Sequence, residues 1–419
     1  MRIQVNALGL LGLLMVTASV STADITLNNY FSDSMVLQRD KPVKVWGSAD
    51  KGADVTVSFS GQTKKTKADE EGNWLVTLDP MQASAEGREI RCSSSAKATA
   101  DKQVSGVRDA VLKDVLVGDV WFFGRQTYAD ISLDRTKDGR DAAAKYKAND
   151  LFRAITIKTI PSATPATNLA ENATTGWMKV DPKNALTMTG SSFYLGRDLV
   201  AELGVPIGII DVNMNHHFAF SWMSKQAIDD TEKMHGTGDT GWLRTSLPEK
   251  LADRESGKAQ EGVDAWNKAR GDNRMLELHP LRNPTYPSCA YNAVISPLRH
   301  ITVKGVLLQL GNDYPFIAYR EMEKRGLLTK PAGFGRAWYD NYYIVKLGFR
   351  ITPKTLPYIP RDWRRTFGDK ALPFGLIMPP ASDLDVLATH NREVRELQRR
   401  TNAQAKGVGL ILPGMKNIP

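Results

Sequence analysis

A threonine hydroxyl follows a short apolar run in this chain. Residues 115–123 are almost continuously apolar and rich in β-branched and aromatic side chains, which predicts a buried strand. Gly124 is expected to end that strand, and the polar residues Arg125, Gln126 and Thr127 come where the chain should turn outward. Ligands of open α/β sheets bind beyond the carboxyl ends of strands, so Thr127 stands where a nucleophile is expected. The alternative is an ordinary strand exit with a polar tip.

Polar residues also follow two other predicted strands, over residues 205–210 and 304–310. The side chains that could take part in chemistry after these strands are Asn215, His216, His217, Gly311, Asn312 and Asp313. In a parallel sheet all three exits would meet at one edge, because each follows the carboxyl end of a strand. We therefore expect them to lie close to Thr127.

Together these residue types suit nucleophilic catalysis, which needs an activated hydroxyl, a base within hydrogen-bond reach and donors for a developing negative charge. Thr127 would supply the hydroxyl, and His216 or His217 would be the base. Asn312 or Asn215 would be the oxyanion donor, and Asp313 would orient the base. Alternatively, the two histidines are surface imidazoles without partners. A metal site is disfavoured because adjacent histidine side chains point in different directions.

The elements that must position these residues alternate between strand and helix after residue 112. Residues 151–157 predict a strand, and residues 193–203 predict a helix that ends at Gly204. This alternation predicts an α/β fold of three layers, with a mostly parallel sheet covered by helices on both faces. Residues 225–285 are charged and contain alanines, which indicates a helical insertion in the domain spanning 112–419.

Residues 24–111 predict a separate β module. Short segments with strand character are separated there by Asp, Gly, Pro and Asn, as in a small antiparallel sandwich. Lys51-Gly52 and Glu71-Gly72-Asn73 are the clearest turn signals. No residue of this module suggests chemistry, so we expect it to pack or to act as a spacer.

The first 23 residues have the pattern of a signal peptide. Arg2 precedes an apolar core over residues 7–20, and small residues at 21–23 offer a cleavage site before Asp24. Because a membrane span needs about 20 apolar residues, we expect export rather than a stable membrane anchor. The predicted location is secreted or periplasmic. Cys92 and Cys289 are far apart and are expected to be free thiols.

The charge pattern argues against nucleic acid as a partner. The formal net charge is +9, but basic residues alternate with acidic ones, as in DRTKDGRD, which is typical of a solvated surface. Zinc-finger spacing, a P-loop and a dinucleotide fingerprint are missing, so no cofactor is expected. His300 and the other histidines outside the strand exits have no motif around them and are expected at the surface or in packing.

Several segments together resemble the sialate O-acetylesterase family. The segments are residues 31–47, 112–121, 202–210, 296–298, 304–306, 361–364 and 373–374, in that order along the chain. The resemblance covers most of the chain after the signal peptide. It implies an SGNH-hydrolase fold, secretion, and an O-acetylated sugar or glycan as substrate.

The catalytic motifs of that family are altered here. The family's G-Q-S-N-M is replaced by residues 125–129, RQTYA, so Thr127 stands where the nucleophilic serine is expected. His216 and His217 occupy the place of a Gly-Gly pair, and LGNDY at residues 310–314 stands for Q-G-E-S-N. The final residues, 413–419, carry neither member of the family's D-x-H-P segment.

These changes predict a weak or inactive hydrolase. The added methyl group of Thr127 restricts χ1 and crowds attack, and a triad without its histidine keeps only about 10³ to 10⁴ of rate enhancement over water. One alternative is a non-catalytic glycan-binding or structural relative. A second is an esterase with a rewired site built from Thr127 and His216 or His217.

Overall fold

The computed structural model describes residues 25–95, 109–125, 131–214, 219–235, 288–309, 356–377 and 406–411, together with residues 396, 399 and 402. The predicted signal peptide at residues 1–23 and most of the predicted insertion at 225–285 lie outside these residues. Both therefore stay predictions.

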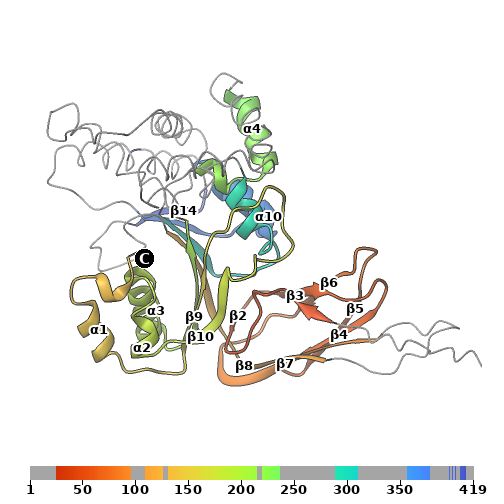
Figure 1. Ribbon diagram of the computed structural model, residues 1–419, viewed down its shortest axis with the longest axis horizontal. Coiled ribbons are helices and arrows are strands. Elements are labelled where there is room, and N and C mark those ends of the chain that lie inside the picture. The colour runs from red at the N-terminus through yellow and green to blue at the C-terminus, as the bar shows by residue number, and fades with distance from the viewer. Residues whose placement is uncertain are drawn as a thin grey trace, which may run out of the picture.

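A mixed sheet of 11 strands forms the centre of the protein (Figure 1). Its main path has the order β10-β9-β11-β8-β12-β13-β14. In that order the strands are Thr174–Lys179, Phe152–Ile157, Ile207–Asn213, Asp109–Arg125, Gly305–Gln309, Phe374–Ile377 and Val408–Ile411. All neighbours on this path are parallel except β10, which runs antiparallel to β9.

Helices cover both faces of this sheet. The helices α1 (Gly139–Lys145), α2 (Pro182–Ala185) and α3 (Gly190–Leu203) lie on one side, and α10 (Tyr358–Phe367) lies on the other (Figure 1). Consecutive residues of β8 serve the two layers: Phe122 packs edge-to-face on Trp363 of α10, and Phe123 belongs to the cluster that contains Phe193 of α3. The predicted three-layer α/β class is confirmed.

The helix α3 shows how local signals set an element. Thr189 accepts a hydrogen bond from the Ser192 amide at the amino end, and Gly204 ends the helix with φ of +62° while its amide donates to the Val200 carbonyl. Glycine adopts this left-handed conformation without a Cβ clash. The predicted end at Gly204 is confirmed, and the helix begins earlier than predicted because Thr189 caps it.

The N-terminal module is built from short antiparallel strands. One sheet has the order β1-β3-β6, with bounds Thr26–Leu27, Val43–Ser48 and Asn73–Leu78. The strand β4 (Asp54–Phe59) pairs with β5 (Gln62–Lys67) and with β7 (Ser84–Ser95). The predicted turns are present, with φ of +72° at Gly52 and +82° at Gly72. The antiparallel character predicted for this module is confirmed.

The strand β8 joins the module to the α/β sheet. It is 17 residues long, and the predicted boundary after residue 111 falls within it. Its first part pairs with β7 and with β2 (Val36–Gln38), whereas its last part pairs with β11 and β12. One backbone segment therefore belongs to both hydrogen-bonded ladders.

A bulge interrupts β8 at Asp114. The pairing with β7 shifts register between Arg88 and Ile90, and Asp114 has φ of +56°. Aspartate is one of the few residues other than glycine that tolerates this conformation. The extra residue bends the strand as it passes from the module into the larger sheet.

The Asp114 carboxylate holds this bend against the α/β sheet. Arg153, a fully buried residue of β9, donates to it at 2.7 Å, Ser34 donates at 3.0 Å, and Lys179 lies 3.0 Å away. Burial of the carboxyl would raise its pKa, but these hydrogen bonds and positive charges outweigh burial and lower the pKa of Asp114 to about 2. Asp114 is therefore ionised at neutral pH.

A second buried carboxylate fixes the segment after β2. Asp119 of β8 is 1% exposed. Its carboxylate accepts hydrogen bonds from Nε and a terminal nitrogen of Arg39, both at 2.9 Å, and from the Gln38 side chain at 3.2 Å. Burial opposes ionisation, yet these hydrogen bonds keep the pKa of Asp119 below its usual value. Gln38 and Arg39, which carry part of the family resemblance, thus have a structural role.

We predict that Asp114→Asn lowers the free energy of unfolding by about 2–3 kcal/mol, because Arg153 loses its charged partner while it stays buried. Asparagine tolerates the left-handed conformation, so the backbone itself is not strained. Since the folded pKa lies below the ordinary value of 3.8, wild type should lose this contribution as pH falls from about 4 to about 2. Urea unfolding at several pH values measures both effects.

The matched control is Asp150→Asn. Asp150 also pairs with Lys179, at 3.3 Å, but its side chain is 78% exposed. An exposed pair contributes about 0–1 kcal/mol. Equal effects of the two variants would contradict the role assigned to Asp114.

Candidate functional site

The three strands that precede the predicted chemical residues end at one edge of the sheet. Arg125 is the last residue of β8, and its register partners are Asn213 of β11 on one side and Gln309 of β12 on the other. The three strands are mutually parallel, so their carboxyl ends coincide. The ladder continues one residue further, since the Met214 amide donates to the Arg125 carbonyl at 2.8 Å.

The residues predicted to carry chemistry follow these strand ends but lie outside the described residues. They are Gln126, Thr127, Asn215, His216, His217, Gly311, Asn312 and Asp313. Their mutual arrangement stays a prediction, whereas the convergence of the strands that lead to them is observed. Within the described ranges, no group of three or more His, Cys, Asp or Glu side chains could hold a metal ion.

The end of β8 differs from the prediction. Gly124 does not end the strand, which continues to Arg125, and Arg125 is 2% exposed rather than turned outward. A Cβ on Gly124 would lie 2.4 Å from the Met214 sulfur and 2.9 Å from Leu308. The glycine is therefore explained by close packing between strands, and not by a turn.

Arg125 is buried because Asp211 neutralises it. Its Nε donates to Oδ1 of Asp211, which is fully buried inside β11. The hydroxyl of Thr189, at the amino end of α3, lies 3.4 Å from the other carboxylate oxygen of Asp211. Asp211 was predicted to begin a polar exit, and that was wrong: it lies within the strand and pairs across it.

Sequence reasoning missed this pair as a functional feature. Arg125 occupies the position of the first glycine in the G-Q-S-N-M motif, so the strand end carries a buried charge where the family has no side chain. The available signal was a base directly after the apolar residues 120–124 and an acid directly after the apolar residues 205–210. A charge is buried only with a partner, but the two residues are 86 positions apart, and spacing could not pair them.

Another part of the resemblance also has a structural role. Asp362 of α10 accepts hydrogen bonds from the amide and hydroxyl of Ser224, at 2.7 and 2.6 Å, just before α4 (Lys225–His235). Next to it, the Trp363 indole donates to the Trp222 carbonyl at 2.9 Å. These contacts join α10 to α4 and are not part of the strand edge.

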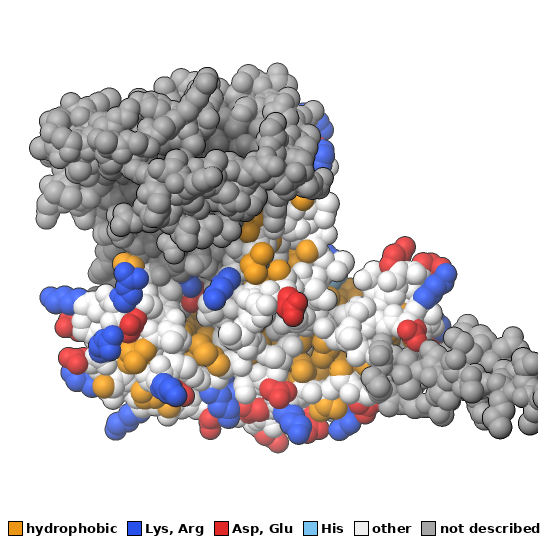
Figure 2. Space-filling model, viewed as in Figure 1, with side chains coloured by type: hydrophobic (Ala, Val, Ile, Leu, Met, Phe, Trp, Pro, Cys, Tyr) orange, Lys and Arg blue, Asp and Glu red, His pale blue; other side chains and the backbone are white. Residues whose placement is uncertain are grey.

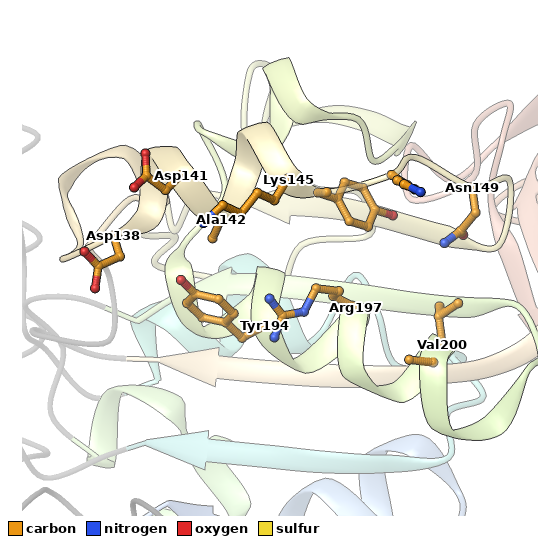
Figure 3. Close-up of a pocket in the computed structure, with 11 residues that line it drawn as sticks. Asp138, Asp141, Ala142, Lys145, Asn149, Tyr194, Arg197 and Val200 are labelled. Atoms are coloured by element: carbon orange, nitrogen blue, oxygen red, sulfur yellow. The ribbon is translucent and has the colours of Figure 1, made fainter.

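A hollow of about 780 Å³ lies between α1 and α3, away from the strand ends (Figure 3). Lys145 and Asp141 of α1 and Tyr194 and Arg197 of α3 line it. Arg197 stacks 4.8 Å from the Tyr194 ring centre and donates to Asp198 at 2.7 Å, so its charge is already partnered. None of its lining residues belongs to β8, β11 or β12.

Charges of both signs alternate over the described surface. On the face shown in Figure 2, Lys and Arg side chains lie among Asp and Glu side chains. Among the described helices, none is long and apolar enough to cross a membrane. Cys92 and Cys289 are both buried, and no disulfide joins them.

Two mammalian proteins that match this chain carry the same name. Sialate O-acetylesterase of Mus musculus is 24% identical over 370 residues, covering 83% of this chain and 59% of its own length. The protein of that name from Rattus norvegicus is 26% identical over 303 residues, covering 68% of this chain and 51% of its own length. This chain is similar to these sialate O-acetylesterases. It thus spans little more than half the length of these relatives.

A solved structure agrees with the fold of this sialate O-acetylesterase relative. The crystal structure of a carbohydrate acetylesterase from Xanthomonas citri matches with a TM-score of 0.62 and 23% identity, covering 93% of this chain and 68% of that one. At this identity the likeness establishes the shared fold alone. No model of a known protein family matches the chain.

We predict that Asp211→Asn lowers the free energy of unfolding by about 3–5 kcal/mol, because it leaves the Arg125 charge buried without its counter-charge. The position is fully buried, so solvent cannot replace the carboxylate. Urea unfolding measures the change.

Asp198→Asn provides the comparison. Its carboxylate also pairs with an arginine, at 2.7 Å, but is 65% exposed. We expect a change of about 0–1 kcal/mol there. A loss at Asp211 no larger than that at Asp198 would show that the buried pair does not stabilise this strand end.

Proposed function

We propose that this protein has a carbohydrate O-acetylesterase scaffold that engages O-acetylated sugars or glycans with little or no hydrolysis. The observation that carries the proposal is the convergence of β8, β11 and β12 at Arg125, Asn213 and Gln309. The relatives named sialate O-acetylesterase support the substrate class. An edge of this kind is where α/β sheets bind their ligands.

The weak activity is proposed from the residues that follow this edge. Thr127 keeps a hydroxyl but adds a methyl group where the related motif has serine, and His216 and His217 replace two glycines. Glycine would allow the backbone to approach the substrate closely, which histidine cannot. The buried Arg125–Asp211 pair adds a further departure, because the related motif begins with glycine there.

Two other functions remain in competition with this one. A non-catalytic relative would bind glycans or serve a structural role without turning over any ester. A rewired esterase would use Thr127 as nucleophile, with His216 or His217 as base. The rewired esterase predicts that wild type turns over an acetyl ester and that turnover depends on the Thr127 hydroxyl. The non-catalytic relative predicts no turnover.

The test compares wild type, Thr127→Ser and Thr127→Ala on 4-nitrophenyl acetate and on an acetylated sugar. We expect turnover near background for all three, with serine raising it by less than about tenfold, or about 1.4 kcal/mol of barrier. Serine removes only the methyl group. His216, His217 and the altered LGNDY segment at residues 310–314 are unchanged. Groups that act as a unit give little when one alone is restored.

The matched control is Thr77→Ala, an exposed threonine of β6. Clear wild-type turnover that Thr127→Ala abolishes, and Thr77→Ala does not, would overturn the proposal. That result would favour the rewired site, and His216→Ala and His217→Ala would then identify the base. Saturable binding of the acetylated sugar with turnover near background fits the proposal, whereas binding that does not require the acetyl group would favour the non-catalytic relative.

We also propose that the protein is exported and that its mature form begins near Asp24. The apolar core over residues 7–20 supports this. Amino-terminal sequencing of the protein recovered from the periplasm or medium should give a start at or near Asp24. A soluble cytoplasmic form that begins at Met1 would contradict export.

A further inference from the structure

A cavity of about 230 Å³ lies where the N-terminal module meets the α/β domain. One wall comes from β3 and β6 of the module, and the opposite wall comes from residues 167–168 and 299–300. None of these residues belongs to or follows the carboxyl end of β8, β11 or β12. The cavity is therefore distinct from the strand edge discussed above.

The register of β3 and β6 determines which side chains face this cavity. Trp46 pairs with Leu75, and Ser48 pairs with Asn73. Residues directly opposite each other in an antiparallel pair share a face, and so do residues two apart along a strand. These four side chains, all of residues that line the cavity, therefore lie on one face of the sheet.

This wall combines apolar and hydrogen-bonding groups. Leu75 is 37% exposed, although it is a large apolar side chain. Beside it, the Asn73 and Ser48 side chains offer hydrogen-bonding groups, whereas Trp46 is 4% exposed and packs against Tyr30, Phe31 and His300.

The opposite wall is held in place by hydrogen bonds from the module. The side-chain amide of Asn28 donates to the Thr167 carbonyl at 2.8 Å. The side chain of Asn29 donates to the Leu169 carbonyl at 2.8 Å and accepts from the Leu169 backbone N–H at 3.0 Å. These contacts fix the loop before β10 against the module. Hydrogen bonds across the junction thus hold this wall of the cavity in position.

His300 contributes a neutral ring to this wall. It packs edge-to-face on Trp46, with ring centres 5.6 Å apart. Burial, followed by the nearby charges of Arg299 and Lys44, lowers the pKa of His300 to about 4. At neutral pH its imidazole therefore offers one donor and one acceptor, the combination that a hydroxyl group can satisfy on both sides.

We propose that this cavity binds a single neutral sugar ring, such as the terminal residue of a glycan. Leu75 supplies apolar contact for the C–H groups of a pyranose, and Asn73, Asn168 and His300 can pair with its hydroxyls. The charged lining residues are Asp69 and Arg299, which cancel, so a neutral ligand is favoured over an anion.

The volume supports one ring rather than an extended chain. Drug-sized ligands occupy pockets of about 300–1,000 Å³, which is larger than the 230 Å³ found here. The site does not depend on ester hydrolysis at the strand edge. It would let the protein hold a glycan whether or not it is a working esterase.

Binding is tested by saturation-transfer NMR and calorimetry with methyl glycosides of galactose, mannose and xylose, and with N-acetylneuraminic acid as the charged comparison. We expect at least one neutral glycoside to bind saturably. Asn73→Trp should abolish this binding by filling the cavity, and Asn73→Ala should weaken it about tenfold through a lost hydrogen bond. Thr77→Ala, on the same face of β6 but outside the cavity, should not change it.

The melting temperature of each variant shows whether it folds, and Asn73→Ala keeps the test valid if the tryptophan variant does not. Thr127→Ala should leave this binding intact, which separates the cavity from the strand edge. The proposal is overturned if no neutral glycoside binds, if only N-acetylneuraminic acid binds, or if a folded Asn73→Trp protein binds as wild type does.

Discussion

The rest of the structure depends on β8, a single strand that takes part in two hydrogen-bonded ladders of the 11-stranded sheet. Its first half completes the ladder with β7, and its second half lies between β11 and β12. A strand of 17 residues cannot stay flat over that distance, because sheets twist. The bulge at Asp114 takes up the change in direction, so the module and the α/β domain share continuous backbone instead of a flexible linker.

Pairs of carboxylates and arginines secure this shared strand. Asp114 and Asp119 lie on β8 and meet Arg153 and Arg39, while Asp211 on the neighbouring strand meets the arginine that ends β8. Each pair joins segments far apart in sequence. A buried charge is costly without its partner, so these pairs favour one register and one docking of the two parts over alternatives that would leave charges unpaired.

Scaffold and chemistry are separable in this relative of the sialate O-acetylesterases. Segments that carry the resemblance have structural roles, as Arg39 has beneath the module and Asp362 has between α10 and α4. Constraints on these residues come from packing and ion pairing, so they are independent of the residues that follow the strand ends. A chain can therefore retain the fold while the positions around Thr127 change.

The sequence by itself determined the elements whose causes are local. The strand at 152–157, the end of α3 at Gly204 and the α/β order of the fold follow from periodicity and capping, which involve residues close together in the chain. Only the tertiary structure decided that β8 continues past Gly124, that Arg125 is buried, and that the module and the domain enclose a cavity beside Trp46. These features arise from contacts between residues tens to hundreds of positions apart, and local pattern contains no information about which distant partner a side chain will meet.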